Sequence, residues 1–92
     1  MDVLAAICRA IHTKHPVAIR YHSMSSGKSE RVIVPFTLID TGLRWHVRDF
    51  DRKSSEFRDF VIMRIEALTL LDEDLKANER PDKDIQWTAS LS

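Results

Sequence analysis

The chain has 92 residues, of which 43% are hydrophobic and 30% are charged, and this composition is typical of one small globular domain. No apolar run approaches the roughly 20 residues that a transmembrane helix needs, so no membrane span is expected. The formal net charge is zero, and the single cysteine, Cys8, excludes an intrachain disulfide and indicates a reducing, cytoplasmic location.

The first predicted element is an amphipathic helix over residues 2–14. Asp2 suits the N-cap of this helix, and Pro16 ends it. Apolar residues recur at helical spacing along one face, namely Val3, Leu4, Ile7, Cys8 and Ile11. We therefore expect the Cys8 thiol to be buried and inert.

Five strands are predicted after the helix, connected by short polar turns. Side-chain alternation and β-branched residues mark them at 17–23, 31–39, 43–51, 56–62 and 65–72. Pro35 cannot donate a hydrogen bond within a sheet, so it marks an edge or a bulge. The sequence thus predicts a mainly β (α+β) domain, in which the helix precedes a strongly bent antiparallel sheet or a partly closed barrel.

The domain is expected to occupy residues 1–72, and residues 73–92 form a polar tail or linker. A helical turn is expected around residues 72–79. Ile85 and Trp87 form a small apolar pair in this tail, and we expect the tail to dock on this domain, on a second copy of it or on a neighbouring domain.

Charge is distributed unevenly along the chain. Residues 9–64 hold eleven Lys or Arg and six Asp or Glu, whereas residues 66–84 hold seven acids and three bases. A basic body and an acidic tail fit either simple solubility or a body that faces anions.

The sequence lacks the motifs of several common catalytic and metal-binding sites. The four histidines and the one cysteine show no zinc-binding spacing, and neither a phosphate-binding glycine loop nor a G-x-S-x-G elbow is present. We therefore expect no catalytic activity, no metal site and no cofactor.

The stretch 43–51 concentrates charged and aromatic side chains on a single strand. Alternation places one set on one face (Trp45, Val47, Asp49 and Asp51) and a second set on the other (Arg44, His46, Arg48 and Phe50). We expect the second face to meet the strands that carry Tyr21 and Arg58. Two interpretations follow: an anion site between the arginines, or a lattice of salt bridges in which Arg48 pairs with Asp51, Asp59 or Glu56.

A series of motifs runs through residues 3–71 in a fixed order. A tyrosine strand at Tyr21 and a serine-rich turn come first, followed by R-x-x-x-P, G-x-x-W, F-D, F-R-x-F and R-I at Arg31–Pro35, Gly42–Trp45, Phe50–Asp51, Phe57–Phe60 and Arg64–Ile65. In this order the chain resembles the WYL domain of bacterial transcriptional regulators. The Trp-Tyr-Leu triplet that names the family reads Trp45-His46-Val47 here.

The resemblance implies an Sm-like or SH3-type barrel preceded by a helix. It also implies a ligand-sensing module, which usually lies between a winged helix-turn-helix domain and a C-terminal extension, and which senses single-stranded nucleic acid or nucleotide-like ligands. The sequence of residues 44–60 most resembles that of regulators that accompany phage-defence genes. A DNA-binding domain, in the same full-length chain or in a partner, and a homodimer are therefore expected partners.

Under this resemblance the ligand would lie in a cationic groove, and Trp45, Phe57 and Phe60 would lie in the core. The candidate ligand-binding residues are Tyr21, Ser23, Ser25, Ser26, Arg31, His46, Arg48, Arg58 and Arg64. The sequence departs from the family at His46, where tyrosine is usual, and at Asp49, where a small residue is usual. We expect Asp49 to face away from the arginines.

No winged helix precedes the first helix, so the chain is expected to be either an excised domain or a short stand-alone protein. Two other functions remain open. One is a ligand-free interaction or oligomerisation module that uses the tail, and the other is an Sm-like RNA chaperone, which follows from the fold class alone.

Overall fold

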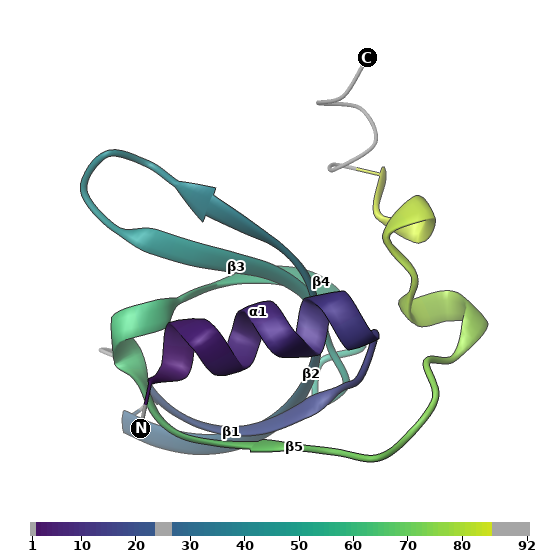
Figure 1. Cartoon of the computed structure of the whole chain (residues 1–92), viewed down its shortest axis with the longest axis horizontal. Helices are drawn as coiled ribbons and strands as arrows, with labels where there is room; N and C mark the ends of the chain where they lie inside the picture. The colour runs from purple at the N-terminus through teal and green to yellow at the C-terminus, as the bar shows by residue number, and fades with distance from the viewer. Residues whose placement is uncertain (1, 24–26, 86–92) are drawn as a thin grey trace.

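A computed structural model describes residues 2–23 and 27–85 (Figure 1). Helix α1 (Val3–Thr13) is followed within these ranges by a five-stranded sheet, and short 3-10 helices interrupt or follow the strands. The strands are β1 (Val17–Ser23), β2 (Gly27–Asp40), β3 (Trp45–Asp51), β4 (Glu56–Val61) and β5 (Ile65–Leu70), and the 3-10 helices are η1 (Ile62–Arg64), η2 (Ala77–Glu79) and η3 (Pro81–Lys83).

Helix α1 begins and ends with capping interactions that its sequence supplies. The side chain of Asp2 accepts a hydrogen bond from the backbone N–H of Ala5 at 3.1 Å. Lys14 ends the helix in the left-handed conformation, with φ 58°. Ile7 and Ala10 are fully buried, so the apolar face of the helix packs against the sheet and adds to the stability that the caps give the helix.

The sheet is antiparallel throughout and follows the order β4-β3-β2-β1-β5. The long strand β2 pairs with both β1 and β3, and its register with β3 shifts between Pro35 and Thr37, at the residue that was predicted to mark an edge or a bulge. The mainly β fold with an N-terminal helix is also confirmed, whereas closure of the sheet into a barrel stays a prediction. Strand β2 begins at Gly27 and not at residue 31, because residues 28–30 continue the pairing with β1 instead of forming a turn.

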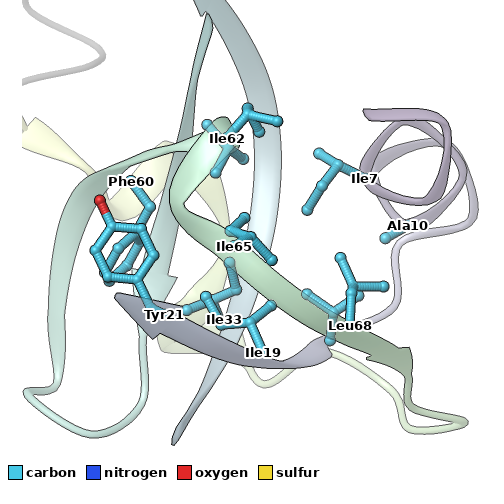
Figure 2. Close-up of a cluster of buried hydrophobic side chains, with 11 residues drawn as sticks. Ile7, Ala10, Ile19, Tyr21, Ile33, Phe60, Ile62, Ile65 and Leu68 are labelled. Atoms are coloured by element: carbon cyan, nitrogen blue, oxygen red, sulfur yellow. The ribbon is translucent and has the colours of Figure 1, made fainter. Parts of the chain in front are cut away.

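The main hydrophobic core lies between α1 and one face of the sheet (Figure 2). It combines Ile7 and Ala10 of the helix with apolar side chains of the strands and of η1, which are Val17, Ile19, Tyr21, Ile33, Val47, Phe60, Ile62, Ile65 and Leu68. Each fully buried aliphatic side chain contributes about 1.5–3 kcal/mol relative to an exposed one. Burial of the face that carries Tyr21 and Phe60 is therefore a main contribution to the stability of the fold.

Two predicted core residues are exposed. Cys8 is exposed because it lies beside the helical face that Ile7 and Ala10 turn toward the sheet. Trp45 is 46% exposed because it begins β3 at the tip of the β2–β3 hairpin. The pairing of β3 with β4 ends one residue later, at His46 and Val61, so no residue of β4 lies opposite Trp45. The prediction that both side chains are buried is wrong.

Residues 72–85 follow the last strand and run along one side of the molecule, close to the C-terminal end of α1 (Figure 1). We call this segment the acidic strap. The helical turn predicted around 72–79 is reduced to η2 at Ala77–Glu79. Trp87 lies outside the described residues. In the described part of the chain, no helix is long and apolar enough to cross a membrane.

Candidate anion-binding site

Strand register decides which charged residues share a face of the sheet. Residues directly opposite each other in an antiparallel pair point to the same side. Arg31 pairs with Ile19, which alternation places on the same face of β1 as Tyr21, so Arg31 faces the core side. The pair Ile33–Asp51 extends this face to β3, and the pair Asp49–Arg58 extends it to β4.

The core-side face brings three of the predicted ligand-binding residues together around one ring. The Tyr21 ring meets the Phe60 ring edge to face, with centroids 4.7 Å apart. The Cζ atoms of Arg31 and Arg58 lie 5.5 Å and 5.9 Å from the centroid of the Phe60 ring. We call Tyr21, Arg31, Arg58 and Phe60 the Phe60 site.

Tyr21 is fixed within this site by a backbone contact. Its hydroxyl oxygen accepts a hydrogen bond from the backbone N–H of Val61 at 3.1 Å, and Figure 2 shows the hydroxyl at the edge of the core beside Phe60. The phenol therefore connects β1 to the end of β4, as expected of a buried tyrosine that needs a partner for its hydroxyl.

The two arginines of the Phe60 site differ in how their charges are balanced. Arg31 forms an ion pair with the fully buried Asp51, and its Nε donates to Ser29 Oγ at 3.2 Å. Arg58 is exposed, and its side chain forms no ion pair within residues 2–23 and 27–85. Arg58 is therefore the group of the site with the most capacity to bind an anion.

Asp49 is fully buried on the same face as Arg58, so the prediction that it faces away from the arginines is right for Arg48 and wrong for Arg58. Neither of its carboxyl oxygens has a hydrogen-bond partner among the residues described. Burial, with smaller contributions from the charges of Asp51 and Asp59, raises the pKa of Asp49 to about 9. The carboxyl group is thus neutral at pH 7 and does not repel an anion bound at Arg58.

Arg48 lies on the opposite face of β3, where it pairs in register with Asp59. Its Nε and Nη2 atoms donate to Asp84 at 2.6 Å and 2.9 Å, and its Nη1 atom lies 3.3 Å from Asp59. The hydrogen bond to Asp84 raises the pKa of Arg48 above its ordinary value. The expectation that Arg48 faces Tyr21 and Arg58 is wrong, whereas the predicted salt bridge to Asp59 is confirmed.

Arg52 has a similar arrangement that the sequence interpretation did not single out. Its Nε and Nη2 atoms donate to Glu79 at 2.6 Å and 3.1 Å, and its Nη1 atom donates to Glu73 at 3.0 Å. Burial opposes ionisation of Glu79, but the hydrogen bonds from Arg52 and from the backbone N–H of Lys76 outweigh it and lower the pKa of Glu79. The acidic excess of residues 66–84 was the signal that pointed to such partners.

The remaining candidate residues lie at other places on the sheet. His46 is half-buried on the face of Arg48, opposite Ile39 and Val61. Ser23 ends β1, and Arg64 ends η1 just before β5. Ser25 and Ser26 lie outside the described residues. No group of three or more His, Cys, Asp or Glu side chains that would suit a metal ion is found in the residues described.

Comparison with known proteins gives one family. The family model for the WYL domain matches residues 2–70. The transcriptional repressor CapW, which is named as DNA-binding, is 37% identical in Escherichia coli strain KTE188 and covers 98% of this chain. CapW of Pseudomonas aeruginosa is 32% identical and covers 99% of it. The chain spans 29% and 30% of the lengths of these two relatives.

A solved structure supports the fold. Proteasome accessory factor B/C of Arthrobacter aurescens matches 84% of this chain with a TM-score of 0.78 and 23% sequence identity. The match covers 12% of that protein. At this identity the likeness supports the arrangement of helix and strands and carries no functional assignment.

Proposed function

Because this chain belongs to the WYL domain family, we propose that it is a ligand-sensing regulatory domain of a bacterial transcriptional regulator. The relatives named as DNA-binding transcriptional repressors support a regulatory role. In this proposal the DNA-binding domain belongs to another part of the full-length regulator or to a partner, and the domain described here binds a ligand without catalysis.

The ligand that we propose is a single-stranded nucleic acid or a nucleotide-like anion, bound at the Phe60 site. The observation that supports it is the pair of guanidinium groups, Arg31 and Arg58, that approach one aromatic ring. Arg31 is neutralised by Asp51 and Asp49 is uncharged, and the exposed Arg58 forms no ion pair with Glu56, the other carboxylate on this face in the residues described, so its guanidinium is accessible to an anion. Arginine binds phosphate bidentately and also stacks on bases, so Arg58 suits both parts of such a ligand.

The test is fluorescence polarisation with a labelled single-stranded oligothymidylate at two salt concentrations. One charge-assisted hydrogen bond contributes about 1.5–3 kcal/mol, so Arg58→Ala should weaken binding about 10-fold to 100-fold. Arg9→Ala removes an exposed arginine of helix α1 and is the matched control, with affinity close to that of the unmodified chain. Absence of binding by the unmodified chain at low salt, or equal affinities for the two variants, would refute the proposal.

A second candidate function is a protein-interaction module, which two exposed side chains favour. Leu43 is 92% exposed and Trp45 is 46% exposed, and both belong to the β2–β3 hairpin that projects from the body in Figure 1. Large apolar side chains at such positions are typical of contact surfaces. If the chain self-associates through them, Leu43→Ser with Trp45→Ser should lower the mass measured by light scattering, and an unchanged mass would exclude this role for the hairpin.

A further inference from the structure

The face of β3 opposite the Phe60 site carries Arg48, and a second arginine, Arg52, comes directly after Asp51, the last residue of the strand. Phe50 lies between the two arginines in the sequence, on the face of Arg48, and contacts Phe57 of β4, with ring centroids 5.1 Å apart. We call Arg48, Phe50, Arg52 and Phe57 the outer arginine surface.

The acidic strap covers the two arginines of this surface with carboxylates in bidentate contact. Asp84 binds Arg48 through two hydrogen bonds of 2.6 Å and 2.9 Å, and Glu79 binds Arg52 through two of 2.6 Å and 3.1 Å. Both carboxylates are almost fully buried, at 2% and 1% exposure. A phosphate presents the same pair of oxygens to a guanidinium, so each carboxylate occupies the position that a phosphate would take.

Arginines alternating with aromatic rings are the elements of a surface for single-stranded nucleic acid. The guanidinium groups neutralise phosphates and the rings support bases, without any need for sequence readout. The backbone N–H of Arg52 donates to the carbonyl of Val32 at 3.0 Å, so this surface is built on the sheet and does not depend on the strap for its backbone.

The strap is attached in a way that permits release. Its backbone hydrogen bonds from Glu79, Lys83 and Asp84 go to acceptors within the strap itself. A pocket of about 320 Å³ lies between the strap and the body, lined on one side by Leu75 and Pro81 and on the other by Ile11, Pro35 and Phe36. Such a space leaves the apolar contact incomplete, so the ion pairs contribute much of the attachment and compete with other anions.

We propose that the acidic strap is a phosphate mimic that occupies, in the same chain, a second binding surface for single-stranded nucleic acid. A polyanion that binds the outer arginine surface displaces Asp84 and Glu79, and displacement frees the strap. The proposal concerns the opposite face of the sheet and does not depend on the Phe60 site.

The first test compares two charge-matched triple variants for binding to a labelled single-stranded oligothymidylate, both in the Arg58→Ala background. One neutralises the carboxylates that contact the arginines, with Glu73→Gln, Glu79→Gln and Asp84→Asn. The control neutralises exposed acids of the same strap, with Asp72→Asn, Asp74→Asn and Asp82→Asn. The first variant should bind at least tenfold more tightly than the control, and adding Arg48→Ala and Arg52→Ala should abolish the gain. Equal affinities, or a gain that survives loss of both arginines, would overturn the proposal.

The second test uses the unmodified chain, so it holds even where a variant fails to fold. Trypsin cleaves after Lys76 and Lys83, which are exposed residues of the strap, whereas Pro81 protects the bond after Arg80. With saturating oligothymidylate, cleavage at these sites should become several-fold faster, because the displaced strap is a better substrate. Unchanged or slower cleavage with the oligonucleotide bound would show that the strap stays in place and would overturn the proposal.

Discussion

The buried carboxyl group of Asp49 makes the stability of this domain depend on pH in an unusual direction. Its pKa is about 9 in the folded chain, mainly because of burial, against 3.8 for an ordinary aspartate. Between these values the unfolded chain has released the proton and the folded chain retains it, so the free energy of unfolding falls as the pH rises. The fall is about 1.4 kcal/mol per pH unit, or about 4 kcal/mol between pH 5 and pH 8.

Asp49→Asn removes this titration and keeps the size of the side chain. The difference in unfolding free energy between the variant and the unmodified chain should therefore grow by about 4 kcal/mol in favour of the variant between pH 5 and pH 8. Small domains have total stabilities of about 5–15 kcal/mol, so the effect is large. Contributions that the two proteins share cancel in the difference.

The assay is urea unfolding followed by circular dichroism at pH 5, 6, 7 and 8. Asp72→Asn removes an exposed carboxylate from the strap and serves as the control, with a curve parallel to that of the unmodified chain. A constant difference between Asp49→Asn and the unmodified chain across these pH values would show that Asp49 ionises in the folded state, and the reasoning from burial would fail.

Two further substitutions test the contacts of the Phe60 site. Arg31→Ala leaves the fully buried carboxylate of Asp51 without its cation, and urea unfolding should show a loss of about 3–5 kcal/mol; a loss below 1 kcal/mol would contradict the buried pair. Tyr21→Phe deprives the N–H of Val61 of its acceptor, and the same measurement should give a loss of about 1–2 kcal/mol with the secondary structure intact, whereas an unchanged stability would mean that water replaces the hydroxyl.

Alternation within strands predicted the grouping of side chains but not the orientation of the groups. Val47, Asp49 and Asp51 share one face, as the sequence indicates, and Arg48 lies on the other. Which face meets Tyr21 depends on the register between strands, and a shift of one residue exchanges the faces. The register shift near Pro35 is a property of the folded sheet, so the sequence pattern alone led to the wrong face for Arg48.

The partners of the arginines show a second limit of sequence interpretation. Asp59 is a near neighbour in the sheet and was among the predicted partners of Arg48, whereas Asp84 lies 36 residues away along the chain. The uneven charge distribution showed an acidic tail after a basic body, but charge sums carry no information on which pairs form. Arg52 was missed for this reason, because only the path of the strap brings Glu79 to it.

The arginines on the two sides of β3 are each accessible to an anion only under a defined condition. On the core side, Arg31 is neutralised by Asp51, and Asp49 adds no negative charge beside Arg58 as long as it keeps its proton. On the outer side, Arg48 and Arg52 are outnumbered by carboxylates while the strap is bound, and they become available only when it leaves. Anion binding on the core side should therefore weaken above about pH 9, where Asp49 ionises, whereas binding on the outer side should depend on displacement of the strap.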